Sequence, residues 1–488
     1  MSGNGFTKSK VMGNMIWRFG ERILAQLTTF IVSVVLARLL PAAAFGDVAL
    51  LMVFIDIANV LVVQGFASSL VQKKDADNID FSSVFFFSIL VSIAFYCLCF
   101  VGSPLLQYIG DAELPALFRV LALRIPLAAI NSVQHAYVQR NLLFKKFFFM
   151  TLIGTILSAG VGIYMAFAGV GAWAIVGQYL TNSLCDTIVL WFTIGWRPIW
   201  VMDFHRLKEL IGFGWKMLCS GLVHVIYNRL TTFFIGTKYT TEDLAFYEQG
   251  QKIPGIVETN IDTAINSVLF PVMAAEQDNK DRVKQMIRRS IQTSGCIIWP
   301  MMMGLAVLAD QIIVLIYGEK WMPAMVFMVI ACIKLTLEPI QTANLQAIKA
   351  IGRSDIYLKM EIAKKTYGIF AILIGIQISV LATAIASATQ ILFAFLVNGL
   401  VNRKLFDYKA GEQCKDVMPS AILSLVMLVI VYIIKNLCSP IGLFSIPIEI
   451  LSGVLIYCVL VFIFNRSQFN YTAGLIKGFF NRATHKLL

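Results

Sequence analysis

The chain has 488 residues, of which 58% are hydrophobic and only 14% are charged. Soluble domains carry about 25% charged residues, so this composition excludes an ordinary water-soluble fold and favours a protein that spans a lipid bilayer. The formal net charge of +12 raises nucleic-acid binding as an alternative, but the basic residues form no stripe with interleaved aromatic residues, so we expect no nucleic acid partner.

Apolar runs cover nearly the whole chain. Since a helix needs about 20 apolar residues to cross a bilayer, the sequence predicts an all-α integral membrane protein with about 14 transmembrane helices. Two boundaries follow from length: the uncharged stretch 367–401 is divided near Ser379, and Gly169-Val170-Gly171 is placed at the turn of a hairpin. The predicted spans are residues 14–39, 45–68, 82–108, 116–139, 147–167, 171–195, 211–236, 243–272, 287–309, 323–348, 358–379, 382–402, 418–436 and 443–465.

The distribution of Lys and Arg over the short loops predicts the orientation, because cytoplasmic loops carry the excess of basic residues. The basic residues in the loops predicted to lie outside are only Arg38, Lys238, Lys320 and Lys435. The loops that are rich in Lys and Arg all lie on the opposite side of the membrane. Both termini are therefore expected in the cytoplasm. The N-terminal apolar run contains Arg18, Glu21 and Arg22 and shows no small-residue cleavage site, so we do not expect a cleaved signal peptide.

A weak internal repeat suggests the domain organisation. Residues 27–31 read LTTFI and residues 230–234 read LTTFF, and each stretch precedes a basic residue and the start of another span. Spans one and seven both begin on the predicted inner side, which favours two parallel six-helix halves. The predicted domains are an N-terminal lobe over 1–205, a C-terminal lobe over 206–410, and two further spans with a tail over 411–488.

Several short motifs together resemble a known family: the polysaccharide-export branch of the multidrug/oligosaccharidyl-lipid/polysaccharide exporter superfamily, which contains the O-antigen and lipopolysaccharide repeat-unit flippases. The resemblance runs from one end of the chain to the other. It is carried by Trp17-Arg18, Gln26, Leu36-Ala37-Arg38-Leu39-Leu40-Pro41, Phe45-Gly46, Gly169-Val170-Gly171-Ala172-Trp173-Ala174 and Leu210-Ile211-Gly212-Phe213-Gly214.

The resemblance implies two six-helix bundles in a V around a central cavity, with two extra C-terminal helices outside them. It implies a flippase of the bacterial inner membrane that moves oligosaccharide repeat units linked to undecaprenyl pyrophosphate by alternating access. The implied partners are this lipid-linked oligosaccharide and the membrane lipids, and the resemblance also allows an association with polysaccharide polymerase machinery.

Polar residues inside the predicted spans are the candidate functional residues, because ionisable groups at membrane depth are costly unless they face a cavity or a partner. Arg and Lys suit a pyrophosphate, since they form charge-assisted hydrogen bonds with its oxygens. The basic and polar candidates for substrate binding are Arg18, Arg22, Arg124, Lys216, His224, Arg229, Lys252 and Lys334. The candidates for internal ion pairs or for ion coupling are Asp56, Glu248, Asp262, Glu338 and His135.

Simpler structural roles compete with these assignments. Arg18 and Arg22 lie near the inner surface, where long side chains extend toward water. Arg124 and Lys252 lie in the outer halves of their spans, where an anchor at the interface is the alternative role. Lys334 and Glu338 are spaced as an intrahelical ion pair.

Three other functional classes remain. A lipid II flippase shares the implied fold and charge, and a cation-coupled drug antiporter of the same superfamily would need more acidic cavity walls. An enzyme acting on the same lipid carrier is the third alternative. The sequence contains no glycine-rich phosphate loop, no paired-carboxylate metal motif and no nucleophile next to a base, so we expect neither an enzyme nor a metal or cofactor.

Overall fold

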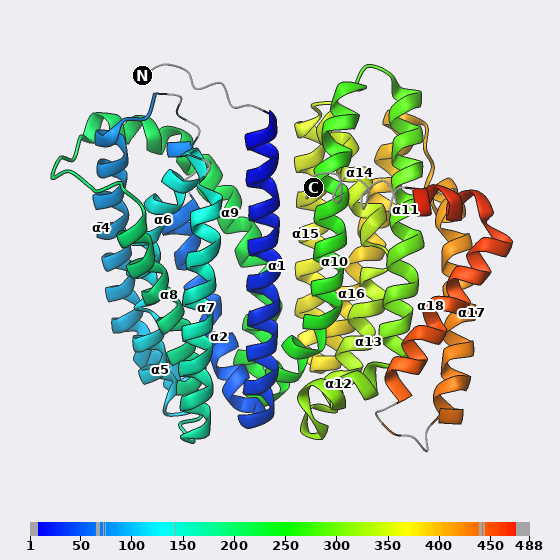
Figure 1. Ribbon diagram of the computed structural model, residues 1–488, viewed down its shortest axis with the longest axis horizontal. Coiled ribbons are helices and arrows are strands. Elements are labelled where there is room, and N and C mark those ends of the chain that lie inside the picture. The colour runs from blue at the N-terminus through cyan, green and yellow to red at the C-terminus, as the bar shows by residue number, and fades with distance from the viewer. Residues whose placement is uncertain are drawn as a thin grey trace. The chain divides into compact units, whose positions relative to one another are not determined.

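The computed structural model describes residues 8–64, 69–71, 73, 75–141, 143–438, 442 and 445–474, without the side chains of 8–19, 21–23, 64, 144–150, 213, 216–217, 264 and 266–268. Throughout these residues the secondary structure is helical, and they contain no strand (Figure 1). The predicted all-α class is therefore confirmed.

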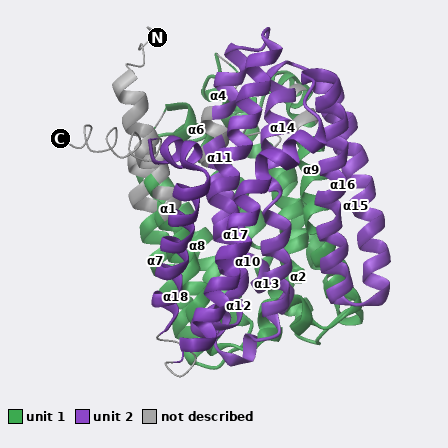
Figure 2. Ribbon diagram, turned by 90° about the vertical axis from the view of Figure 1, so that its right-hand side faces the viewer, with its two compact units in different colours: residues 1–245 green, residues 246–488 purple. Residues whose placement is uncertain are grey.

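The chain forms two compact units, residues 1–245 and 246–488 (Figure 2). We refer to them as unit 1 and unit 2. The predicted boundary at residue 205 was drawn from a sequence repeat rather than from compactness, and it stays a prediction. The elements of unit 1 are α1 (Lys8–Leu39), α2 (Ala42–Asn59), the π-helical η1 (Val60–Gln64), α4 (Asn78–Gly102), η2 (Ser103–Tyr108), α5 (Leu114–Leu121), α6 (Arg124–Asn141), α7 (Phe144–Phe167), α8 (Trp173–Thr193) and α9 (Phe204–Lys238).

Helix α10 (Thr241–Ala275) begins at the end of unit 1 and provides the first element of unit 2. The remaining elements of unit 2 are α11 (Lys280–Val307), α12 (Ala309–Tyr317), η3 (Glu319–Trp321), α13 (Ala324–Leu335), α14 (Glu338–Ala350), α15 (Ser354–Ile378), α16 (Val380–Phe406), α17 (Ala410–Cys438) and α18 (Ile446–Phe464).

Each predicted span coincides with one helix or with two consecutive helices. Eight of the described helices are long and apolar enough to cross a membrane, and α13 and α14 would together form a ninth crossing that bends by 40° at its break. The count of 14 stays a prediction. The predicted division near Ser379 is confirmed, because α15 ends at Ile378 and the Ser379 side chain accepts a hydrogen bond from the backbone N–H of Ala382 in the first turn of α16.

The turn between α7 and α8 also matches its prediction. Gly169 has φ = +76° and Gly171 has φ = +61°, which is the left-handed region that glycine enters without steric cost. The two helices pack along one another as a hairpin.

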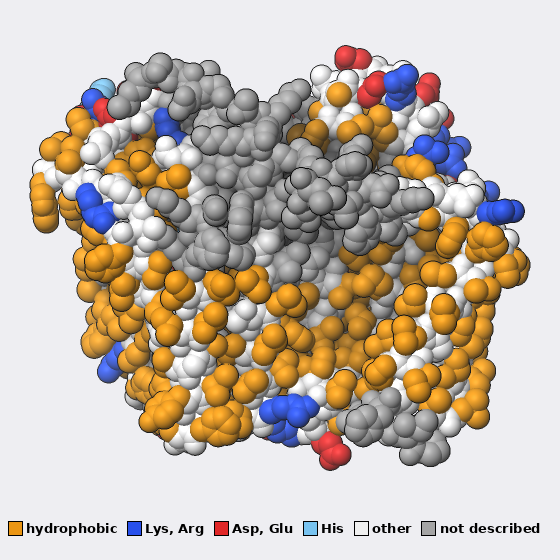
Figure 3. Space-filling model, in the orientation of Figure 1, with side chains coloured by type: hydrophobic (Ala, Val, Ile, Leu, Met, Phe, Trp, Pro, Cys, Tyr) orange, Lys and Arg blue, Asp and Glu red, His pale blue; other side chains and the backbone are white. Residues whose placement is uncertain are grey.

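Large apolar side chains cover the outer surfaces of both units. Leu98, Phe192, Leu400 and Leu455 each expose more than 60% of their surface. Figure 3 shows apolar side chains spread over the described part of the visible face, with charged side chains mainly near its edges. Contiguous apolar surface of this extent is rare on soluble proteins. This protein is therefore a multi-pass membrane protein.

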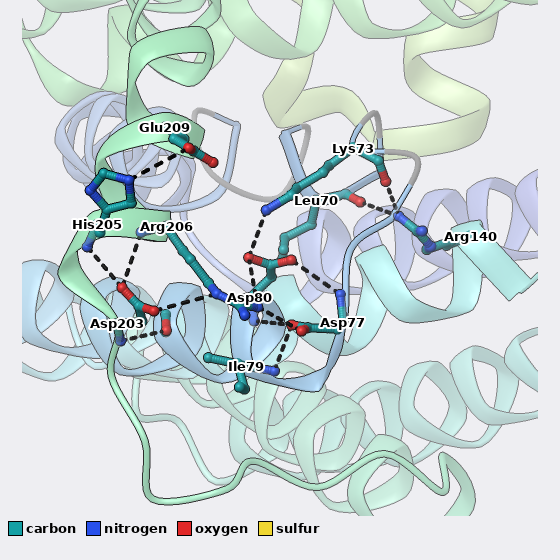
Figure 4. Close-up of polar contacts among 11 residues, drawn as sticks. Leu70, Lys73, Asp77, Ile79, Asp80, Arg140, Asp203, His205, Arg206 and Glu209 are labelled. Atoms are coloured by element: carbon teal, nitrogen blue, oxygen red, sulfur yellow. Dashed lines mark hydrogen bonds and ion pairs between the residues drawn. The ribbon is translucent and has the colours of Figure 1, made fainter.

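A cluster of charged residues at one end of unit 1 joins the beginnings of α4 and α9 (Figure 4). We call Lys73, Asp77, Asp80, Asp203 and Arg206 the Arg206 cluster. Arg206 Nη1 lies 2.6 Å from Asp77 Oδ2, Arg206 Nε lies 3.3 Å from Asp203 Oδ2, and Lys73 Nζ lies 2.9 Å from the buried Asp80 Oδ1. Hydrogen bonding to Arg206 lowers the pKa of the Asp77 carboxyl below its ordinary 3.8.

The same region positions the end of α6. Arg140 Nη1 donates to the backbone oxygens of Leu70, at 2.9 Å, and Lys73, at 2.5 Å (Figure 4). Helices α6 and α9 are thus both fixed at this end of unit 1, before they reach the cavity described below.

Unit 2 contains a comparable buried network around Asp416 of α17, which is only 5% exposed. Its carboxylate accepts hydrogen bonds from Arg288 Nε and Nη2 and from Gln292 Nε2, all at 2.8 Å, and from Tyr408 Oη at 2.6 Å. The network joins α11 to the start of α17.

Gly46 marks the closest approach of α2 to the start of α10. A Cβ atom placed on Gly46 would lie 1.6 Å from the backbone oxygen of Thr241. Only glycine allows the two backbones to come this close.

Candidate functional site

Unit 1 contains a polar cavity of about 740 Å³ formed by α2 with η1, α6, α8 and α9. The apolar residues among the described lining are Val60, Val63, Ala128 and Val225. The polar lining residues are Asp56, Asn59, Arg124, Asn131, Ser132, His135, Asn182, Ser183, Asp186, His224, Asn228 and Arg229. Five of the residues predicted from the sequence therefore meet here: Asp56, Arg124, His135, His224 and Arg229.

An ion pair joins α2 to α9 at this cavity. Arg229 Nη2 lies 2.6 Å from Asp56 Oδ2, and Arg229 Nε donates to the same oxygen at 2.9 Å. The side chains are 35% and 24% exposed, so the pair faces the cavity rather than a sealed core. Asp56 compensates the charge of Arg229 in this arrangement.

Arg124, at the first residue of α6, has a different environment. Its Nε donates to Ser183 Oγ at 3.3 Å, and its guanidinium carbon lies 4.7 Å from the centre of the Tyr179 ring. Cation–π contact of this kind holds an arginine without neutralising it. None of the carboxylates in the described residues forms an ion pair with Arg124. The positive charge of Arg124, unlike that of Arg229, is therefore not compensated by a contact with a carboxylate.

The two histidines have separate partners. His135 Nε2 lies 3.6 Å from Asp186 Oδ2, which is an ion pair only when the ring is protonated. His224 Nε2 and Asn228 Nδ2 are 2.9 Å apart, one helical turn along α9.

Amide groups provide the neutral part of the lining. Asn131 Nδ2 lies 3.5 Å from the backbone oxygen of Ser183. The side-chain oxygens of Asn59 and Asn131 are buried and have no hydrogen-bond partner among the described residues. Such groups bind hydroxyls and other neutral donors.

Asn182, Ser183 and Asp186 of α8 were not selected from the sequence. Asn182 and Asp186 are four residues apart, so they share one face of a helix. This spacing within the apolar run 171–195 is the signal that would have identified them.

A second group of charged residues lies in unit 2. Glu258 and Asp262 of α10 and Lys334 and Glu338 on either side of the break between α13 and α14 are close enough for their charges to act on one another. Lys364 and Glu361 of α15 also act on Glu338, so the group contains four carboxylates and two lysines. It is acidic, unlike the basic lining expected from the sequence. Glu258 was not selected from the sequence.

The break changes the interpretation of Lys334 and Glu338, which were candidates for an intrahelical pair. Lys334 lies in the last turn of α13, and Glu338 is the first residue of α14.

Glu248 and Lys252 lie one turn apart on α10, and their charges act on each other.

Three predicted residues lie outside the described side chains. Arg18 and Arg22 belong to α1 and Lys216 belongs to α9, and their roles stay predictions. Among the described residues, no three His, Cys, Asp or Glu side chains are grouped in a way that could hold a metal ion.

The cavity of unit 1 can therefore bind an anion and neutral hydroxyls together. Its described lining contains two arginines and two aspartates, and contacts compensate Arg229 but not Arg124. The amides that line the same cavity add hydrogen-bonding groups of both kinds.

Two curated relatives are similar to this chain. One is the teichuronic acid biosynthesis protein TuaB of Bacillus subtilis, 25% identical over 305 residues, which cover 61% of this chain and 62% of TuaB. The other is the succinoglycan biosynthesis transport protein ExoT of Rhizobium meliloti, 25% identical over 329 residues, 67% of this chain and 66% of ExoT. The chain thus spans slightly less than two thirds of either relative's length.

Among solved structures, the lipid II flippase MurJ in an inward closed conformation is similar with a TM-score of 0.76 and 16% identity, over 93% of this chain and 99% of that one. This likeness shows the fold, which is the all-α arrangement that the chain shares with that structure. Residues 35–326, more than half of the chain, match the family described as "Polysaccharide biosynthesis protein". This protein therefore belongs to the Polysaccharide biosynthesis protein family.

Proposed function

We propose that this protein is a flippase that moves oligosaccharide repeat units linked to undecaprenyl pyrophosphate across the bacterial inner membrane for surface polysaccharide or lipopolysaccharide biosynthesis. The family, the transport function printed for ExoT and the transporter fold support this proposal. The observation that carries it is Arg124, an arginine that faces a polar cavity and has no ion pair with any carboxylate that the structure describes.

The contacts in the cavity suggest how the load would be held. Arg124 would bind the pyrophosphate through charge-assisted hydrogen bonds, and the amides of Asn59 and Asn131 would accept hydrogen bonds from sugar hydroxyls. Arg229 would join the binding site when the pyrophosphate displaces Asp56. Because the load would then replace an internal ion pair, it would favour whichever conformation separates Asp56 from Arg229.

The remaining parts of the proposal concern location and energy. Both termini would lie in the cytoplasm, as the basic loops predict, and the lipid chain would stay in the bilayer while the head group crosses by alternating access. The acidic group Glu258, Asp262 and Glu338 in unit 2 would suit a coupling cation. No chemical step on the substrate is proposed, so the protein would be a transporter and not an enzyme.

Two related functions are alternatives. A lipid II flippase is favoured by the fold shared with MurJ. A cation-coupled drug antiporter is favoured by the acidic group in unit 2.

Complementation of a deletion strain tests the proposal. We would replace Arg124 with Gln and measure both surface glycan and the lipid-linked repeat units that accumulate inside, at matched membrane levels. Arg119→Gln is a matched control, because Arg119 Nε also donates to a serine, Ser103 Oγ at 2.6 Å, and its guanidinium also lies over an aromatic ring, 4.8 Å from the centre of Phe100. Arg119 is not among the residues that line the cavity.

We expect Arg124→Gln to reduce surface glycan at least tenfold and to accumulate the precursor, while Arg119→Gln supports normal export. Equal export by both variants would contradict a role for the cavity. If deletion arrests peptidoglycan synthesis and leaves other glycans intact, the lipid II alternative holds instead. If no glycan depends on the protein but drug tolerance does, the antiporter alternative holds.

A further inference from the structure

Five amide side chains meet inside unit 2, between α14, α16 and α17. We call Gln341, Asn344, Asn398, Asn402 and Gln413 the amide cluster. Gln341 is 5% exposed and the other four are completely buried. The cluster belongs to neither of the charged sites described above.

Hydrogen bonds link the three helices through these amides. Asn398 Nδ2 of α16 donates to Gln341 Oε1 of α14, and Gln341 Nε2 donates to the backbone oxygen of Ile391 at 3.3 Å. Asn344 Nδ2 of α14 donates to Gln413 Oε1 of α17 at 2.9 Å. Asn402 follows Asn398 by one turn on α16.

Half of the polar atoms of the cluster remain unpaired. The side-chain oxygens of Asn344, Asn398 and Asn402 and the side-chain nitrogens of Asn402 and Gln413 are buried and have no hydrogen-bond partner among the described residues. Buried polar groups are normally paired with protein or with ordered water. Five such atoms in one cluster therefore indicate a ligand.

The unpaired atoms determine the chemistry of that ligand. Three are acceptors and two are donors, and none of the five side chains is charged. A cation would face the N–H donors, and an anion would face the carbonyl oxygens. Water is small, donates and accepts together, and typically makes about three hydrogen bonds in such sites.

We propose that the amide cluster is an internal water-binding site that extends from the first turn of α17 to α14. Gln413 lies in that first turn, beside the partly exposed ion pair of Lys284 and Glu412 at 3.3 Å. At the other end, Gln341 lies three residues from Glu338 on α14. Water bound between the three helices pairs the amide atoms that have no partner among the described residues.

This inference is independent of the proposed function. The alternative is dry helix packing, in which amides only join neighbouring helices. The two differ at Asn402, because neither of its side-chain polar atoms has a partner in the part of the protein that the structure describes.

Asn402→Leu distinguishes the alternatives through the Tm of the full-length protein in detergent. Dry packing predicts a higher Tm, because the change removes two unpaired polar atoms and keeps the side chain's size. Bound water predicts a lower Tm, because the water loses its partners. Asn398→Leu is the control that calibrates the assay. It should lower the Tm under both alternatives, because it removes the hydrogen bond to Gln341.

X-ray hydroxyl-radical footprinting of the unmodified protein provides a direct test that needs no variant. Radicals formed from bound water oxidise side chains beside it even when bulk solvent does not reach them. Tyr408, whose backbone N–H donates to the Asn402 backbone oxygen at 3.3 Å, and Tyr317, which packs against Trp321, are both completely buried.

We expect Tyr408 to be oxidised several-fold faster than Tyr317, and Asn402→Leu to remove most of this difference. Equal oxidation of the two tyrosines, or a higher Tm for Asn402→Leu, would overturn the proposal.

Discussion

The ion pair between Asp56 and Arg229 allows a quantitative test of the cavity of unit 1. Its shortest contact is 2.6 Å, and its side chains are 24% and 35% exposed. Fully exposed pairs contribute about 0–1 kcal/mol, and breaking a fully buried pair costs about 3–5 kcal/mol. For this partly exposed pair we expect a coupling free energy of about 1–2 kcal/mol, discounted for screening by water in the cavity.

The coupling is measured by a double-mutant cycle. Asp56→Ala, Arg229→Ala and the double variant would be unfolded in detergent while tryptophan fluorescence is recorded. Each single variant leaves one charge uncompensated, so each should destabilise the protein, and the double variant should cost less than their sum. A coupling below about 0.5 kcal/mol would match independent sites and would refute the reasoning.

Three further predictions concern the fold. Gly46→Ala should lower the free energy of unfolding by about 1–3 kcal/mol, because the new Cβ collides with the Thr241 backbone, whereas Gly255→Ala on α10, with no neighbour within 4 Å, should not; equal thermal shifts would contradict the close approach. Asp416→Asn should cost about 2–3 kcal/mol, because it leaves Arg288 without its charge partner; the cost of breaking a fully buried pair is discounted here because the Arg288 side chain is 45% exposed to water. Tyr408→Phe should cost about 1 kcal/mol, because it removes one hydrogen bond; the reverse order in a denaturant titration would be inconsistent with that network. Because the pKa of Asp77 is lowered on folding, its contribution is complete above pH 3.8 and is lost as the pH falls through its folded value, so Asp77→Asn should flatten the decline in Tm below pH 3.8 and leave the slope near neutral pH unchanged.

Hydropathy and length predict the helices well, because a membrane span has to be apolar over its whole length. They do not predict breaks within a span. The stretches 116–139 and 323–348 read as single apolar runs, yet α5 ends at Leu121 before α6 begins, and α13 ends at Leu335 before α14 begins. The short α12 was missed because its nine residues are far fewer than a crossing requires.

The sequence predicted which residues belong to the candidate site better than it predicted which of them form ion pairs. Asp56 and Arg229 were the deepest charges in their spans, but they are 173 residues apart, and no local pattern joins them. Asp186 could have been identified from its spacing with Asn182, but its contact with His135 of α6 is likewise visible only in the structure. The acidic surroundings of Lys334 depend on α10 lying beside the break between α13 and α14, which is tertiary information.

The break between α13 and α14 also creates two helix termini in the interior of one predicted span. The C-terminus of a helix carries a partial negative charge and the N-terminus a partial positive charge. Lys334 occupies the last turn of α13, and Glu338 occupies the first turn of α14, so each charge faces a peptide dipole of opposite sign. Exchanging the two residues would keep the composition of the span and reverse both dipole interactions, so the order in which they occur is itself a stabilising feature.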